Sequence, residues 1–132
     1  MPFVPFDGVL LDDPREPIPG ALALLLHLNV ERELAAAFRR APLGREAVQG
    51  RARACQELLA QGLLPDQLRG LDLPLGRPEE PGSLGSLVAH LEAYLAAVEA
   101  SGHLEPMAAL GRAALAQEAG GRGFWVEHTR ED

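Results

Sequence analysis

The residues from Ser83 to Gly102, SLGSLVAHLEAYLAAVEASG, constrain the fold more than any other stretch, because their apolar positions repeat at steps of three and four. This spacing forms one continuous apolar stripe along a helix and leaves Glu92 and Glu99 on the opposite side. Ser83 is positioned to accept a hydrogen bond from the first free amides, and Gly102 provides a stop. The helix is therefore predicted to bury one face, formed by Leu84, Leu87, Val88, Leu91, Tyr94, Leu95 and Val98.

An earlier helix is predicted to begin near Gly20, directly after Pro19, and to continue to about Arg40. Its first half is apolar nearly all round, as expected of a buried helix, and a buried strand over Leu22 to Leu28 is the competing interpretation. The good helix formers that continue to Arg40 favour the helix. In the second half, the predicted buried side holds Val30, Leu34, Ala37 and Phe38. The residues expected to face water are Glu31, Arg32, Glu33, Arg39 and Arg40.

Prolines and glycines divide the rest of the chain. A helix is predicted from about Arg45 to Gln61, and its buried stripe is formed by Val48, Cys55, Leu58 and Leu59. One short helical turn follows, with Pro65 at its first position, and then a loop over 72–83. A last helix is predicted from Pro106 to Gly120-Gly121, and the tight connection before it favours antiparallel packing on the preceding helix.

The two ends of the chain are predicted to be extended. The first nineteen residues contain five prolines, which prevent a continuous helix, and Val9–Leu11 after a turn at Asp7-Gly8 is the best strand candidate. Phe124, Trp125 and Val126 are β-formers after a glycine hinge, so a short strand there is predicted to pair with the N-terminal one. The predicted fold class is a mainly α, four-helix bundle-like domain with short N- and C-terminal β-strands that pair. One domain is predicted over 1–132, with a proline-rich extended segment over 1–19, a helical core over 20–121 and a strand or tail over 122–132.

The charge and composition exclude several chemistries. All twelve basic residues are arginines, whereas a P-loop, a Schiff-base enzyme and a PD-(D/E)XK nuclease normally need a lysine. The net charge of −7 opposes nonspecific attraction to nucleic acid or anionic lipid. Cys55 is the only cysteine, so no internal disulfide and no cysteine-rich zinc site is expected. The lack of lysine and the abundance of Leu, Ala, Gly and Pro indicate a GC-rich, thermophile-like composition.

No run of residues approaches the ~20 apolar residues that a membrane helix needs. The most apolar stretch, Ala21–Val30, lies behind the acidic Asp12 and Asp13, too far along the chain for a secretory signal. We therefore expect a cytoplasmic protein with no membrane partner.

Residue types that carry catalysis are dispersed along the sequence. Cys55 lies among apolar residues, where a thiol is usually part of the core. The histidines lack the spacing of a helical zinc motif, and they are His27, His90, His103 and His128. His27 is expected to make a local polar contact with Glu31, four residues along. The sequence therefore predicts no catalytic, cofactor-binding or metal-binding residue, and the chain is predicted not to be an enzyme.

Three other features are alternative interaction sites. Phe124 and Trp125 either cap the core or, if exposed, contact a protein partner or a second copy. A small-molecule or enzymatic site is the alternative for the region near His27, His90 and Tyr94. Five arginines within fifteen residues either lie on solvated helix faces or contact the phosphates of a nucleic acid. These are Arg39, Arg40, Arg45, Arg51 and Arg53.

Two segments carry a family resemblance. In RARACQELLAQGLLPDQLRGL (Arg51–Leu71) a helix leads into a GLLPDQL turn, and LGSLVAHLEAYLAAVEASGHLEPMAALGRAA (Leu84–Ala114) contains a helix that ends at a glycine before a second helix opens. In this order and separation they resemble a helical region of the AddB-type subunits of bacterial helicase–nuclease complexes. The matching positions are Tyr94, Gly102, Leu104 and Pro106, while Glu105 replaces the usual Asp. The resemblance covers roughly half the chain without helicase or nuclease motifs, and it implies a helical, non-catalytic portion or free-standing relative of such a protein.

The leading hypothesis from the sequence is a non-enzymatic helical module that acts through protein contacts in DNA processing. Self-association is a companion prediction, because a chain of this size exposes a large fraction of its surface. Direct nucleic-acid binding through the arginine cluster is the second hypothesis, disfavoured by the negative net charge.

Overall fold

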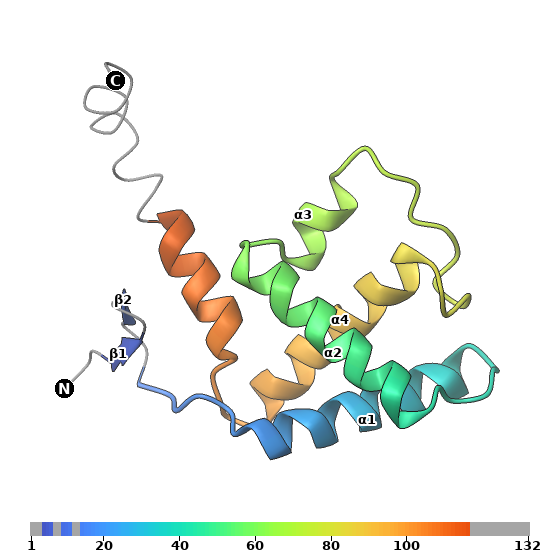
Figure 1. Ribbon diagram of the computed structural model, residues 1–132, viewed down its shortest axis with the longest axis horizontal. Helices are drawn as coiled ribbons and strands as arrows, with labels where there is room; N and C mark the ends of the chain where they lie inside the picture. Colours follow the sequence, from blue (N-terminus) through green and yellow to red (C-terminus); the bar gives the residue numbers. More distant parts are fainter. Residues whose placement is uncertain (1–3, 7–8, 12–13, 117–132) are drawn as a thin grey trace.

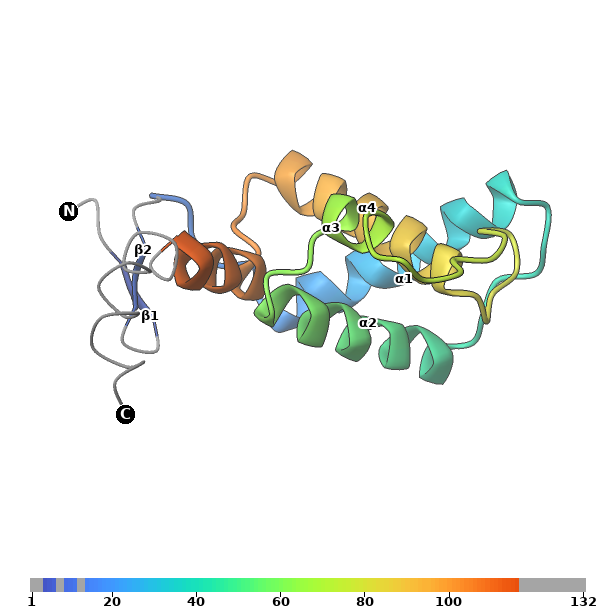
Figure 2. The same cartoon turned by 90° about the horizontal axis from the view of Figure 1, so that it is seen from above.

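The computed structural model describes residues 4–6, 9–11 and 14–116 and is mainly α-helical, as predicted. Its named helices are α1 (Gly20–Ala37), α2 (Arg45–Ala60), α3 (Pro65–Arg69) and α4 (Leu84–Ala100). A fifth helical segment covers 106–116 and is called helix 106–116 below. In Figure 1 α1 runs close to the long axis of the molecule, α2 and α4 are inclined to it in opposite directions and cross each other, and helix 106–116 lies toward one end (Figures 1 and 2). No helix among the described residues is both long and apolar enough to cross a membrane.

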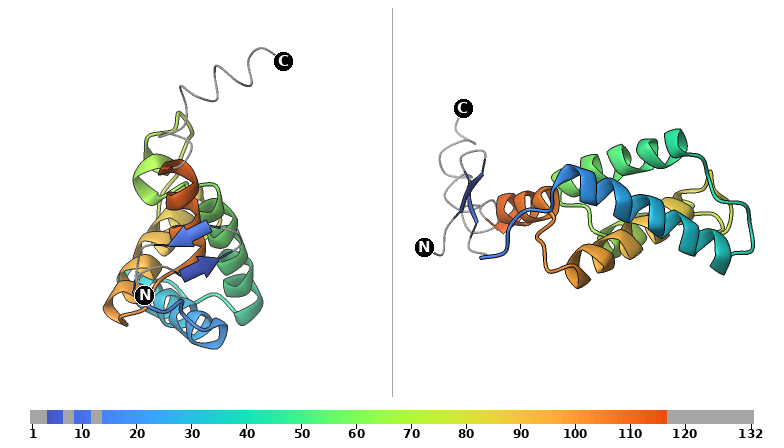
Figure 3. Two further views of the ribbon diagram at one scale, coloured as in Figure 1. Left: turned by 90° about the vertical axis from the view of Figure 1, so that its left-hand side faces the viewer. Right: turned by 90° about the horizontal axis from the view of Figure 1, so that it is seen from below.

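Helix α1 lies against both α2 and α4, as the right-hand view of Figure 3 shows. The helix prediction for this segment is confirmed and the competing strand over 22–28 is excluded. The helix ends at Ala37, earlier than predicted, because Arg39 adopts the left-handed conformation, with φ at 57°, that terminates many helices.

Helix α4 begins as the sequence predicts. The Ser83 hydroxyl accepts a hydrogen bond from the Ser86 amide at 3.0 Å, and Gly102 follows the end of the helix with φ at 80°. Two polar residues of α4, Ser86 and His90, also face the core. They are as buried as their apolar neighbours.

The core has two main clusters of buried apolar side chains. One lies between α2, α3, α4 and helix 106–116 and contains Cys55, Leu59, Leu68, Val88, Leu91 and Ala108. The other lies between α1 and α4 and contains Ile18, Ala23, Val30, Tyr94 and Val98. Tyr94 is completely buried, so α4 contributes its largest side chain to the interface with α1.

Four details of the α1 prediction are wrong. Ala37, which was assigned to the buried side, is exposed, and Arg40, which was expected to face water, is only partly exposed and pairs with Glu31. Glu31 was expected to face water, yet it is 1% exposed, because two arginines from later segments surround its carboxylate. Leu25 lies in the half that was expected to be buried nearly all round, yet its side chain is exposed. The apolar residues of α1 are left exposed because its neighbours cover only part of its circumference.

Helix 106–116 leaves the end of α4 at a steep angle and does not lie antiparallel along it (Figures 1 and 2). The connection is held instead by the N-terminal segment. The Leu104 amide donates to the Glu16 carbonyl at 2.9 Å, and the Ile18 amide donates to the Leu104 carbonyl at 2.8 Å. A short parallel bridge between Pro17 and Leu104 thus replaces the predicted turn.

Two short strands precede the helices, β1 (Val4–Phe6) and β2 (Val9–Leu11), and they pair antiparallel with Val4 opposite Leu11. The predicted strand at Val9–Leu11 therefore pairs with the segment just before it. The predicted C-terminal strand at Phe124–Val126 and the helix end at Gly120-Gly121 lie outside the described residues.

Candidate functional site

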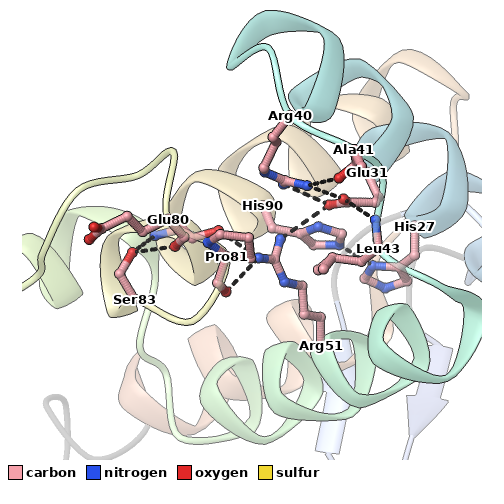
Figure 4. Close-up of polar contacts among 11 residues, drawn as sticks. His27, Glu31, Arg40, Ala41, Leu43, Arg51, Glu80, Pro81, Ser83 and His90 are labelled. Carbon is pink, nitrogen blue, oxygen red and sulfur yellow. Dashed lines mark hydrogen bonds and ion pairs between the residues drawn. The ribbon is translucent and has the colours of Figure 1, made fainter.

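Helices α1 and α4 bring two histidines and a tyrosine together in the core. His27 Nδ1 and His90 Nε2 share a hydrogen bond of 2.9 Å, and the two side chains are 1% and 0% exposed (Figure 4). The His27 ring also stacks on Tyr94, with ring centroids 3.8 Å apart and planes 11° from parallel. The sequence alternative that named these three residues therefore selected side chains that do meet.

The histidine pair is neutral in the folded chain. Burial lowers the pKa of His27 to about 4, and burial together with the nearby His27 lowers the pKa of His90 to about 3. Among the described residues, His27 Nε2 and His90 Nδ1 have no hydrogen-bond partner. In either tautomer one ring must donate to the other, so one buried N–H and one buried lone pair remain unpaired.

This arrangement is suited to structure rather than to proton transfer. A general base needs a pKa near the working pH and access to its substrate. Both rings lie under other side chains, and their pKa values fall well below neutrality. No group of three or more His, Cys, Asp or Glu side chains within the described ranges is placed to hold a metal ion.

Tyr94 links the histidine pair to helix 106–116. Its hydroxyl donates to Glu105 Oε2 at 3.1 Å, and Glu105 Oε1 accepts from the Ala108 amide at 3.0 Å. Glu105 therefore caps the start of the helix, the role that its place before Pro106 allows. Burial and the adjacent Glu105 carboxylate raise the pKa of Tyr94, so the phenol stays protonated and remains a donor.

Glu31 is the centre of a second polar cluster. Arg40 donates to both of its carboxylate oxygens, at 2.5 and 3.1 Å, and Arg51 Nη1 lies 3.4 Å from Oε1 (Figure 4). The Leu43 amide adds a hydrogen bond of 2.8 Å. Burial alone would raise the pKa of Glu31, but the hydrogen bonds and charges of these neighbours hold it below its ordinary value. The carboxylate stays ionised and fastens α1 to the segment that leads into α2.

Arg51 extends this cluster to α4. Its Nη2 donates to the Pro81 carbonyl at 2.8 Å and to the Ser86 hydroxyl at 2.5 Å. One guanidinium thus connects α1, α2, the loop before α4 and the first turn of α4. Bonds of this charge-assisted kind are stronger than neutral ones, and they fix the separation of α2 and α4.

The structure divides the predicted arginine cluster. Arg40 and Arg51 belong to the buried ion cluster and face Glu31, so they are not available to phosphates. Arg39, Arg45 and Arg53 are exposed, and phosphate contact stays a prediction for these three. Cys55 is completely buried, and burial raises the pKa of its thiol to about 12, consistent with a core residue.

A hollow with a mainly apolar lining lies between α2 and the start of α4. We call it the α2–α4 groove; its volume is about 540 Å³, and it is lined by Ala54, Glu57, Leu58, Ala60, Gln61, Leu84 and Leu87. Adjoining hollows continue along α2 toward Gly50 and Pro81 in one direction and toward Met107 in the other.

Sequence reasoning missed this groove because it assigned Leu58, Leu84 and Leu87 to fully buried stripes. All three are only partly buried. Small residues on the neighbouring turns of α2, Gly50 and Ala54, leave the leucines uncovered, and this small-residue spacing is the signal that sequence reasoning had available.

A second hollow, of about 320 Å³, lies between α3, α4 and helix 106–116. Two of its carboxylates form exposed ion pairs: Glu99 lies 3.2 Å from Arg15, which also lines the hollow, and Glu92 lies 2.7 Å from Arg69, which does not. Exposed pairs of this type contribute little to stability. The lining holds four carboxylates, Asp66, Glu92, Glu99 and Glu105, and two arginines, Arg15 and Arg112, so acidic groups are in excess.

Phe124 and Trp125, the predicted partner contacts, lie outside the described residues. In comparisons with known proteins, no family model, no curated protein and no solved structure matches this chain.

Proposed function

We propose that the chain is a non-enzymatic helical protein-interaction module and that the α2–α4 groove is its binding surface. The observation that carries this proposal is the groove itself, where three half-buried leucines and two alanines line a hollow bordered by Glu57 and Gln61. An apolar surface with a polar rim is typical of a site that binds a partner segment.

The groove is supported as a rigid, preformed site. Arg51 connects α2 to Ser86 in the first turn of α4, one residue before Leu87 in the groove wall. Glu31 holds Arg51 from the other side. A surface whose walls are fixed before binding loses less conformational entropy when a partner binds, which favours affinity.

The buried histidines support the non-enzymatic part of the proposal. His27, His90 and Tyr94 are packed side chains of the α1–α4 interface and line neither the α2–α4 groove nor the hollow beside α3. We therefore assign them to the scaffold. An association with DNA processing is supported by the resemblance to AddB-type subunits, whose two segments include α2 and α4, the helices that form the groove.

The experiment compares three forms of the chain as bait in an extract of the native organism. Ala54→Glu places a charged side chain in the groove, and Ala47→Glu makes the same change on an exposed position of α2 outside it. We expect a protein that is retained by the wild type and by Ala47→Glu but is retained at least about tenfold less by Ala54→Glu.

Equal retention of every captured protein by the three forms would overturn the proposal. Sedimentation of the wild type over a range of concentrations tests whether the partner is a second copy of this chain. Dimerisation that Ala54→Glu abolishes also supports the groove. A monomer that captures no protein would refute it.

A further inference from the structure

The outer side of α2 carries two opposite charges about one helical turn apart, Arg53 and Glu57. Both side chains are exposed, and both line the hollow that continues from the α2–α4 groove toward Met107. Among the described residues, neither side chain forms an ion pair or a hydrogen bond. An arginine four residues before a glutamate is also the less favourable order for a pair within one helix. Both charges are therefore available to a second molecule.

The side of α2 that faces α4 carries the apolar part of the groove. Its leucines are only partly buried, and they are Leu58, Leu84 and Leu87. By the helical period, Gly50 and Ala54 lie between this apolar side and the charged side of α2. Nothing lies within 4 Å of a Cβ added at Gly50. Small residues at these positions allow another helix to approach α2 closely.

This surface is complementary to itself in one arrangement of two copies. In a two-fold dimer the same surface of both copies meets. A two-fold axis that crosses α2 at the level of Cys55 makes the two α2 helices antiparallel and keeps the apolar side of one copy against the apolar side of the other. Residues equally far before and after position 55 then lie opposite each other. Arg53 of each copy faces Glu57 of the other, and Gly50 faces Ala60.

The alternative two-fold axis, parallel to α2, does not match the surface. It would place Arg53 of one copy level with Arg53 of the other and would set the leucines against the charged side. The chain as a whole has a net charge of −7, so two copies repel each other on average. At this surface Arg53 and Glu57 cancel. Arg51, the other charged residue that lines the groove or its adjoining hollows, already pairs with Glu31.

We infer that the partner of the α2–α4 groove is a second copy of this chain, which packs its α2 antiparallel on α2 and forms two reciprocal Arg53–Glu57 ion pairs. The inference rests on the proposed function of the groove, to which it adds the identity of the partner. It gives the partly buried leucines of each copy an apolar surface to pack against, the same leucines of the other copy.

Sedimentation of the full chain over a range of concentrations tests the inference. We expect the wild type to dimerise. Arg53→Glu and Glu57→Arg should each dimerise at least about tenfold more weakly, because each change turns both ion pairs into like-charge contacts. An equimolar mixture of the two variants should dimerise again, since the mixture restores opposite charges at both contacts. The double variant Arg53→Glu/Glu57→Arg should regain dimerisation by itself.

The control is Arg32→Glu, the same charge reversal on an exposed arginine of α1, which should dimerise like the wild type. Arg53 and Glu57 are exposed, so their variants should keep the circular dichroism spectrum of the wild type. Ala54→Glu places a charge between the leucines of the two copies. It is a second disrupting variant in case a single charge reversal does not fold.

Three results would overturn the inference. These are a wild type that stays monomeric at every concentration, a dimer that the folded charge variants leave unchanged, and folded single variants whose mixture does not associate. A monomeric wild type with a different protein that requires Ala54 would reject the inference alone. A dimer that neither the charge variants nor Ala54→Glu weaken, with no groove-dependent protein captured, would reject the proposed function as well.

Discussion

The His27–His90 contact makes the stability of the chain depend on pH. Both rings are neutral when folded, because burial lowers their pKa values to about 4 and about 3, whereas in the unfolded chain they titrate near 6.5. Between these values the unfolded chain binds more protons than the folded one, so the free energy of unfolding falls as the pH falls. The stabilisation is complete above about pH 6.5 and is lost toward pH 4. The pKa of Glu31 is lowered as well, so its contribution is also lost as the pH falls, but only below its unfolded pKa of 4.5.

Denaturant titrations between pH 7 and pH 5 isolate the histidines. We expect the wild type to lose about 2 kcal/mol for each histidine, or about 4 kcal/mol, over this interval and the double variant His27→Gln/His90→Gln to lose far less. His103→Gln, on a partly exposed histidine outside the cluster, should keep the wild-type slope. A double variant with an undiminished slope would show that other groups cause the pH dependence.

Among conservative changes of the charged residues of α1, Glu31→Gln is expected to be the most destabilising. The amide removes the charge that Arg40 and Arg51 surround, and it leaves two guanidiniums facing each other in a buried site. Removing one partner of a buried ion pair costs about 3–5 kcal/mol of unfolding free energy. The matched change at the exposed Glu33 should cost less than about 0.5 kcal/mol. Chemical denaturation measures both, and equal effects would contradict the assignment of Glu31 to the scaffold.

Among the elements, helix 106–116 depends on close contact with α2. Alanine forms helix better than glycine by about 1 kcal/mol, so Gly→Ala changes in helices are usually favourable. At Gly50 nothing lies within 4 Å of an added Cβ, and Gly50→Ala should raise the free energy of unfolding by about 0.5–1 kcal/mol. At Gly111 the added Cβ would collide with the Leu59 carbonyl. Gly111→Ala should therefore lower the free energy of unfolding by about 1–3 kcal/mol. The same sign at both sites, in thermal or denaturant unfolding, would show that the two helices do not approach this closely.

The sequence predicted those features of the elements that depend on neighbouring residues. Ser83 and Gly102 bound α4 through local hydrogen bonds and backbone conformation, and Pro65 begins α3 in the same way. Features that depend on distant residues were missed. Glu31 is buried because its partners lie 9 and 20 residues away, and helix 106–116 takes its direction from the bridge between Pro17 and Leu104.

The candidate site also has one feature that the sequence predicts and one that it does not. The proximity of His27, His90 and Tyr94 was predictable because all three lie on the facing sides of two helices. The α2–α4 groove was not predictable from hydrophobic spacing, because Leu58, Leu84 and Leu87 have the period of buried residues. The small residues beside them, Gly50 and Ala54, leave one side of these leucines uncovered.

At the scale of the whole molecule, the scaffold and the proposed binding surface are separate. The Glu31 cluster joins α1, α2 and the start of α4 (Figure 4), and the Tyr94–Glu105 contact joins α4 to helix 106–116. The groove lies on the outside of this frame, along α2. Changes in the frame should therefore alter stability, and changes in the groove should alter binding.

Partner binding by His27→Gln tests this separation most directly, measured at pH 7 on chain whose folding has been confirmed. We expect this variant to unfold at lower denaturant concentration than the wild type and to bind the groove-dependent partner with unchanged affinity. Ala54→Glu should show the reverse, with normal unfolding and at least about tenfold weaker binding. Loss of binding by the folded His27→Gln chain, with binding retained by Ala54→Glu, would contradict the account and place the functional site at the histidine pair.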